Sequence, residues 1–158
     1  MESTLITRSP EETIEIGREL ARRLKPPVLV LLSGELGSGK TTLTKGIVSG
    51  LGAAREEDVT SPTFTLVHVF GEKTTVAGQQ GAQDERGAQN AAKVYHVDLY
   101  RVEQFRDLET LALEDALAEP AIVIIEWSER FALRSEWPRV TVRLEHVEGD
   151  ARRITLSE

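Results

Sequence analysis

Several short stretches of the chain are apolar at nearly every position, which is the pattern of strands inside a sheet. Residues 28–32 read Val-Leu-Val-Leu-Leu, and residues 121–126 read Ala-Ile-Val-Ile-Ile-Glu. A run without alternation is typical of a strand that is covered on both faces. Residues 4–7, 63–70 and 94–99 predict three further strands.

Near the end of the chain, the pattern changes to an alternation of apolar and polar residues. Residues 140–145 and 152–156 both alternate, and Glu148, Gly149 and Asp150 between them suggest a turn. This arrangement predicts an antiparallel hairpin.

Helices are predicted between several of these strands. Ser9 can cap a helix, Pro10 suits its first position, and Glu12 completes a capping box. Further helices are expected from Lys40 to about Ser49 and over residues 107–117. Because strands alternate with helices, the chain is expected to form an α/β sandwich with a mostly parallel sheet.

Residues 71–92 differ from the rest in composition. This stretch is rich in glycine and glutamine, and Val76 is its only large aliphatic residue. It cannot bury enough apolar surface to order itself. We interpret it as a disordered, mobile loop that joins two antiparallel strands, within a chain of 158 residues that forms a single domain over 1–158.

Composition and charge narrow the function classes. The chain has no cysteine, which excludes disulfides, thiolate metal sites and a cysteine nucleophile. The net charge of −7 argues against a protein that grips nucleic acid by itself. The chain shows neither a long apolar stretch nor the start of a signal peptide, so we expect a cytoplasmic protein.

The strongest motif follows the strand predicted at residues 28–32. Residues 34–41 read Gly-Glu-Leu-Gly-Ser-Gly-Lys-Thr and match G-x-x-x-x-G-K-[ST] in full. Its glycines let backbone N–H groups turn toward a triphosphate, Lys40 reaches the β- and γ-phosphates, and the hydroxyl of Thr41 suits Mg²⁺. A strand before the motif and a helix after it are the setting that a P-loop requires. The motif therefore predicts a site for ATP and Mg²⁺, and no [N/T]-K-x-D segment follows that would favour GTP.

Two acids stand where strands are predicted to end. Asp98 closes residues 94–97, and Glu126 closes residues 122–125. P-loop enzymes need one acid to hold the Mg²⁺ water shell and a second group to orient the attacking water. Either acid can take either task, and the alternative is that both are helix N-caps or solvated acids at strand ends. Lys40, Asp98 and Glu126 are the candidate catalytic residues, and Thr41, Glu126 and Asp98 are the candidate metal ligands.

Other residues near these motifs are candidates for supporting roles. Ser61, Pro62 and Thr63 can form a loop that senses the γ-phosphate, or a plain turn bounded by proline. Strand alternation places His96 on the same face as Asp98, where a structural role is favoured. Two further candidates have alternatives of their own. Arg101 can pair with Asp98 or contact phosphate, or it is an ordinary surface residue. Trp127 is a core anchor or a partner-facing aromatic.

Taken together, the motifs resemble those of one family. The ordered set is GELGSGKTTLTKG, SPTFTLV, YHVDLYRV and IIEW. It is similar to the TsaE family, formerly YjeE, and the resemblance covers nearly the whole chain. It implies a P-loop NTPase-like fold, a three-layer sandwich with an antiparallel hairpin, and hydrolysis of ATP to ADP and phosphate. It also implies that the protein acts together with TsaD and TsaB, which install the threonylcarbamoyl group on adenosine 37 of tRNA. Contact with tRNA would then be made by these partners.

The resemblance also implies roles for individual residues. It implies Mg²⁺ on Thr41 and Glu126, an acidic role for Asp98, a switch-like loop over residues 61–63, and a requirement for Trp127. Phosphate binding falls on Gly37, Ser38, Gly39, Lys40, Thr41 and Thr42. Two departures stand out: Glu35 replaces a common aspartate, and residues 71–92 are longer than the usual connection.

Two other functions remain open on this scaffold. One is a small-molecule kinase, which would need an acceptor pocket and usually a lid that carries arginines. The other is a non-enzymatic scaffold that regulates a partner by its bound nucleotide. No arginine finger is evident in the sequence, so an ATPase of this kind is expected to be slow without partners.

Overall fold

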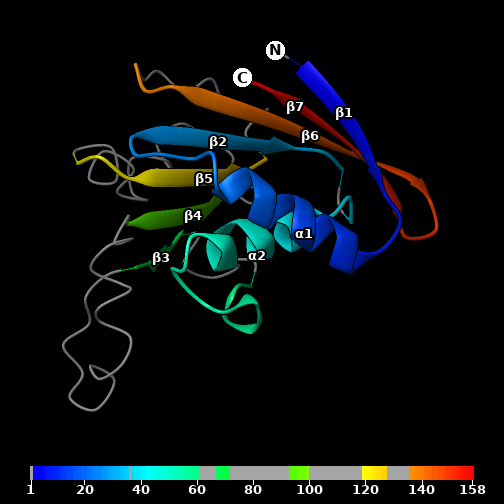
Figure 1. Cartoon of the computed structure of the whole chain (residues 1–158), viewed down its shortest axis with the longest axis horizontal. Helices are drawn as coiled ribbons and strands as arrows, with labels where there is room; N and C mark the ends of the chain where they lie inside the picture. The colour runs from blue at the N-terminus through cyan, green and yellow to red at the C-terminus, as the bar shows by residue number, and fades with distance from the viewer. Residues whose placement is uncertain (1, 36, 61–66, 72–92, 100–118, 128–135) are drawn as a thin grey trace.

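The computed structural model describes residues 2–35, 37–60, 67–71, 93–99, 119–127 and 136–158, which build one seven-stranded sheet with two α-helices packed on it (Figure 1). The helices are α1 (Pro10–Ala21) and α2 (Lys40–Gly50), and a 3-10 turn, η1, covers Glu56–Asp58. The strands are β1 (Glu2–Thr7), β2 (Val28–Ser33), β3 (Val67–Phe70), β4 (Val94–Asp98), β5 (Ile122–Glu126), β6 (Arg139–Glu148) and β7 (Ala151–Ser157).

The sheet is parallel in the middle and antiparallel at both sides. Its strand order is β1-β7-β6-β2-β5-β4-β3. The four central strands β6, β2, β5 and β4 pair in parallel, whereas β3 pairs antiparallel with β4, and β1, β7 and β6 form an antiparallel group. The predicted α/β class is confirmed, with a mixed sheet whose parallel centre brings the carboxyl ends of four strands to one edge.

Most predicted elements lie within one or two residues of their expected positions. The hairpin of β6 and β7 turns at Gly149, whose φ of 53° is in the left-handed region. The antiparallel pairing of β3 with β4 is also as expected. Residues 63–66, the helix expected over 107–117 and the loop at 72–92 lie outside the described residues.

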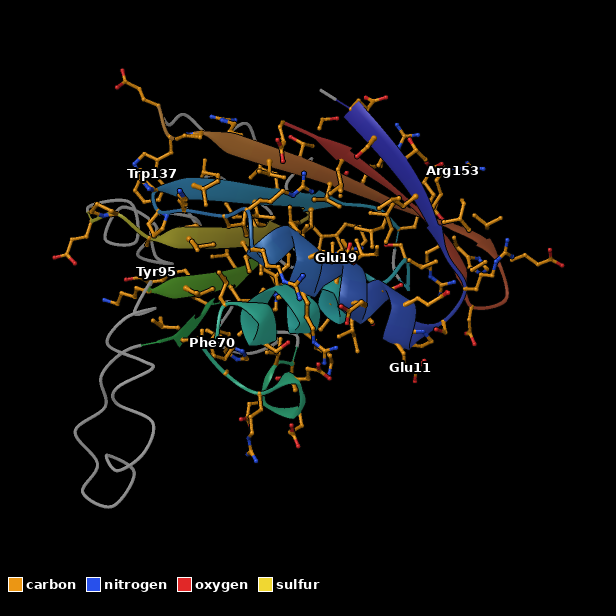
Figure 2. All side chains as sticks on the ribbon, in the orientation of Figure 1. Glu11, Glu19, Phe70, Tyr95, Trp137 and Arg153 are labelled. Carbon is orange, nitrogen blue, oxygen red and sulfur yellow. The ribbon has the colours of Figure 1, made fainter. Side chains whose placement is uncertain are left out.

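The main core lies between the sheet and the two helices, which are side by side on one face (Figure 1). The N-cap prediction for α1 is confirmed, because the Oγ of Ser9 accepts the backbone N–H of Glu12 at 3.1 Å. The charged side of α1, with Glu11 and Glu19, is exposed (Figure 2). The opposite face of the sheet carries a second, smaller cluster, formed by Leu29, Val97, Leu99, Ala121, Val123 and Ile125.

Glycines allow the two helices to approach each other closely. A β-carbon on Gly46 would fall against the carbonyl oxygen of Ile14, and one on Gly17 would fall against that of Leu43. Contacts this short are not tolerated by real side chains, so the spacing of α1 and α2 depends on these two positions. The packing of α1 in turn holds α2, whose first turn forms part of the site.

The described helices give no candidate for a membrane span, since each is too short or too polar to cross a bilayer.

Candidate phosphate-binding site

The loop between β2 and α2 has a shape that only glycine permits at its ends. Gly34 has a φ of 143°, and a β-carbon there would fall against the carbonyl oxygen of Leu144 and 2.7 Å from the Oγ of Ser38. Gly39, with a φ of 103°, caps α2. The left-handed turn at Gly39 starts the helix at Lys40, so the first free N–H groups of α2 face the interior of the loop.

Lys40 is buried inside this loop, with a side chain held by backbone oxygens. Its ammonium donates to the carbonyls of Gly34 at 2.7 Å and Glu35 at 2.8 Å, and it lies 3.4 Å from the Oγ of Ser38. The same Nζ lies 3.9 Å from the ring centroid of Trp127, in cation–π range. These contacts fix a positive charge at the mouth of the loop.

Trp127 reaches Lys40 through an unusual backbone conformation. It directly follows Glu126 at the end of β5, and its φ of 65° makes it the one non-glycine residue with positive φ among the described residues. A bulky side chain in this region is strained. The strained turn folds the indole back over the ammonium instead of continuing the strand.

A polar chain runs from α2 into the sheet below the loop. The hydroxyl of Thr41 contacts both carboxylate oxygens of Glu126, at 3.1 and 3.2 Å. The Nε2 of His96, on β4, contacts the Oε2 of the same carboxylate. Because an ionised carboxylate can only accept, Nε2 carries the hydrogen, and the buried Nδ1 of His96 has no hydrogen-bond partner in the structure as described.

Asp98 lies next to Glu126 across two parallel strands. The two residues are register partners at the ends of β4 and β5, and both are nearly buried. Register partners point to the same face, so both acids lie on the side of α2, as does His96 two residues earlier. The structure therefore brings together Lys40, Thr41, His96, Asp98 and Glu126, whereas Ser61, Pro62, Thr63 and Arg101 lie outside the described residues.

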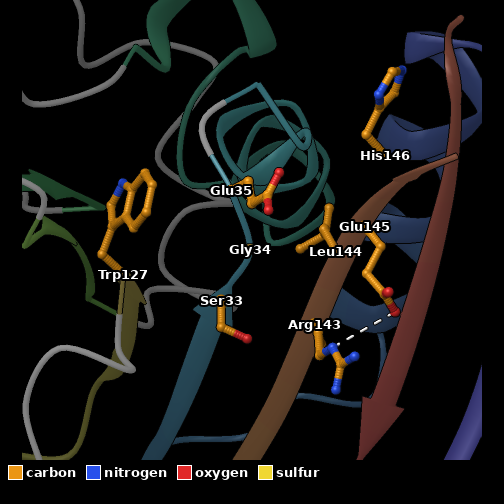
Figure 3. A pocket seen from close by; sticks show the side chains of 8 residues that line it. All are labelled: Ser33, Gly34, Glu35, Trp127, Arg143, Leu144, Glu145 and His146. Carbon is orange, nitrogen blue, oxygen red and sulfur yellow. Dashed lines mark ion pairs between the residues drawn. The ribbon is translucent and has the colours of Figure 1, made fainter. Parts of the chain in front are cut away.

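A hollow of about 440 Å³ opens beside the first residues of the loop (Figure 3). Trp127 stands on one side of it, Leu144 and His146 stand on the other, and Glu35 lies between them. Below them, Arg143 and Glu145 form an ion pair at 3.6 Å. The hollow borders Gly34, Glu35 and Trp127, three of the residues that contact the Lys40 ammonium, so it adjoins the loop on the side of that charge.

One contact to the loop comes from a residue that the sequence does not single out. Arg152, near the start of β7, donates from Nη2 to the carbonyl oxygen of Gly37 at 3.1 Å. In the sequence, Arg152 is simply a polar position of an alternating strand, 115 residues from Gly37. No local pattern identifies it, because the contact depends on the place of β7 in the sheet.

Comparison with known proteins decides the family. A family model described as "Threonylcarbamoyl adenosine biosynthesis protein TsaE" matches residues 7–154, nearly the whole chain. The chain belongs to the TsaE family. The resemblance seen in the sequence is thus confirmed.

Individual TsaE proteins are similar over most of their length. The tRNA threonylcarbamoyladenosine biosynthesis protein TsaE of Treponema pallidum is 32% identical over 139 residues, which cover 88% of this chain and 87% of that protein. The protein of the same name from Bacillus subtilis is 30% identical, covering 96% and 82%, and that of Streptomyces coelicolor is 35% identical, covering 86% and 80%.

A solved structure shares the fold of this TsaE chain. The crystal structure of Bacillus subtilis YdiB superposes with a TM-score of 0.64 at 24% identity, covering 99% of this chain and 84% of that one. The match shows that the two chains share an overall fold.

Proposed function

We propose that this chain is a Mg²⁺-dependent ATPase that acts in the formation of threonylcarbamoyladenosine at position 37 of tRNA, together with TsaD and TsaB. The observation that carries the proposal is the convergence of the Lys40 ammonium and the Thr41–Glu126 pair at one loop mouth. The family name and the names of the relatives support the pathway.

The donor set fits a magnesium ion. A hydroxyl and a carboxylate from facing elements already touch, and both are the hard oxygen ligands that Mg²⁺ prefers. No group of three or more His, Asp or Glu side chains suited to a metal occurs among the described residues. One or two protein ligands are enough for Mg²⁺, because the ion keeps several water molecules and binds the substrate phosphates as well. Bound between Thr41 and Glu126, it would neutralise charge on the β- and γ-phosphate oxygens.

The residues of the chain divide the remaining work. Loop N–H groups and the Lys40 ammonium hold the phosphate oxygens and stabilise the negative charge that develops as the γ-phosphate leaves. The contact of Glu126 with Thr41 supports a role at the metal, and Asp98, its register partner at the end of β4, is our candidate for orienting the attacking water. His96 holds the Glu126 carboxylate from the sheet side.

Phosphate release and binding calorimetry with Mg²⁺ and adenine nucleotide test the proposal. We expect Lys40→Ala to lower kcat/KM at least about a hundredfold, since it removes charge-assisted bonds of roughly 1.5–3 kcal/mol each. Lys45→Ala is the matched control, because Lys45 lies on the same helix and contacts the Glu56 carbonyl at 3.5 Å, away from the loop. Equal activity of the two variants would contradict the assignment.

The pathway has its own test. Depletion of the protein in cells is expected to lower threonylcarbamoyladenosine in tRNA, measured by mass spectrometry of nucleosides. Purified TsaD and TsaB are expected to raise the slow basal rate. Unchanged modification after depletion would remove the pathway assignment and leave the nucleotide site standing.

The hollow beside the loop keeps a kinase as a second candidate, because its volume of about 440 Å³ is enough for a small acceptor molecule. Product analysis separates the two reactions. An ATPase releases one phosphate per ADP, whereas a kinase releases ADP without free phosphate when its acceptor is present.

A further inference from the structure

The guanidinium of Arg152 lies between two parts of the chain that are distant in sequence. Its Nη2 donates to the Gly37 carbonyl in the loop at 3.1 Å. Its Nη1 donates to the carbonyls of Gly149 at 2.9 Å and Ala151 at 3.0 Å, at the β6–β7 turn. One planar group therefore joins the hairpin end to the phosphate loop.

The side chain also lies along the outer wall of the loop. A β-carbon built on Gly39 would lie 3.9 Å from the Cγ and Nε of Arg152 and 3.5 Å from a methyl group of Leu144. Arg152 and β6 thus back the loop from outside, while Lys40 holds its carbonyls from inside. The segment Gly37–Gly39 contains only one side chain, the small one of Ser38, so contacts from other parts of the chain must fix its conformation.

The direction of the contact matters for binding. An arginine that takes the Gly37 carbonyl fixes the orientation of that peptide on the outer side of the loop. Peptides that are oriented before the ligand arrives lose less conformational entropy when it binds. A positive charge directly behind the loop also favours an anion within it.

We propose that Arg152 is a positioning residue for the phosphate loop, which sets the Gly37 peptide for the phosphate chain of the nucleotide. This inference rests on the proposed function, since it assumes that the loop holds ATP. Through Arg152, the antiparallel side of the sheet would contribute to nucleotide affinity. The alternative is that Arg152 only closes the β6–β7 turn.

The decisive experiment compares two neighbouring arginines. Arg152→Gln removes the contact, and Arg153→Gln is the control, because Arg153 is exposed on the same strand and pairs only distantly with Glu145, at 3.9 Å (Figure 2). We expect Arg152→Gln to raise the Kd for Mg-ADP and the KM for ATP about tenfold, the effect of one lost bond to a charged donor, while kcat stays within about twofold. Arg153→Gln is expected to match the wild type.

A second variant separates geometry from charge. Arg152→Lys keeps the charge but replaces the planar fork by a single point donor, so it is expected to recover only part of the affinity. Full recovery by lysine would overturn the geometric role. A lower unfolding temperature in Arg152→Gln with an unchanged Kd would assign the residue to the turn alone and overturn the proposal. If the wild type binds no Mg-ADP, the proposed function itself fails, which is a different outcome.

Discussion

At the scale of single residues, the Glu126 carboxylate is oriented by contacts from two other side chains. His96 is fully buried and reaches the Glu126 carboxylate from the sheet, while Thr41 reaches it from α2. An oriented carboxylate loses little freedom when it binds a cation, so its supporting hydrogen bonds tune metal affinity.

Removing the imidazole is therefore expected to weaken magnesium binding. His96→Leu should raise the Mg²⁺ concentration for half-maximal ATPase activity by roughly tenfold, within the range seen for groups that support metal ligands. His96→Gln keeps an N–H donor and should lose less. The Mg²⁺ titration of the rate measures both, and equal half-saturation in all three proteins would contradict this role.

Trp127 places its indole ring over the Lys40 ammonium, but its backbone has a positive φ that is strained for a bulky residue. Both Trp127→Ala and Trp127→Gly remove the ring from the Lys40 ammonium, so we expect both to lower ATPase activity alike. Glycine also relieves the strain at a φ of 65°, so it should be the more stable of the two variants by about 1 kcal/mol. Urea unfolding checks this order, and a more stable alanine variant would argue against strain.

At the scale of elements, the loop is presented by β2 and α2, and α1 holds α2 in place. The glycines between the two helices make this packing sensitive to a single methyl group. In an isolated helix, Gly46→Ala would stabilise by about 1 kcal/mol. Here the added β-carbon meets the Ile14 carbonyl, so we expect a net loss of about 1–3 kcal/mol, measured by urea unfolding. A stabilised variant would show that the helices move apart without cost.

The sequence predicts an element well where the burial of its own residues sets the order of apolar and polar positions. The unbroken run of β2 and the turn at Gly149 are visible in the chain because each follows from nearby residues. The glycines of the loop and Lys40 are likewise visible in the sequence, because the motif that contains them is continuous. Arg152 and the contact between Gly34 and Leu144 were not, since they exist only after β6 and β7 take their places in the sheet.

At the scale of the whole molecule, parallel strands gather the acids and antiparallel strands support the loop. Sequence alternation predicted the hairpin but gave no sign that β1 joins it, so the antiparallel group is wider than expected. The position of a strand at the edge of a sheet cannot be predicted from its own residues, because it depends on how all the other strands pair.

Histidine burial near the site is expected to make global stability depend on pH. Burial first, and neighbouring His96 second, lower the pKa of His68 from its ordinary value of 6.5. The unfolded chain then binds a proton more readily than the folded one, so the free energy of unfolding should fall as pH drops below about 6.5 and stay level above it. His68→Gln should flatten this decline in urea unfolding between pH 8 and pH 5.5. The same change at exposed His146 should leave it intact.

The pairing of β1 with β7 has a consequence for how the sheet is completed during folding. Glu2 lies opposite Ser157, and β1 has its sheet partner only in β7, within the part of the chain described. Residues 155 positions apart are brought together here, and the entropy of closing so long a loop must be lost before the contact is gained, so β1 is expected to join the sheet late in folding. Leu5 and Ile6 stay exposed even in the finished sheet, and β1 is the outermost of the described strands on its side, so this side presents apolar residues on an open edge to which another extended chain could add.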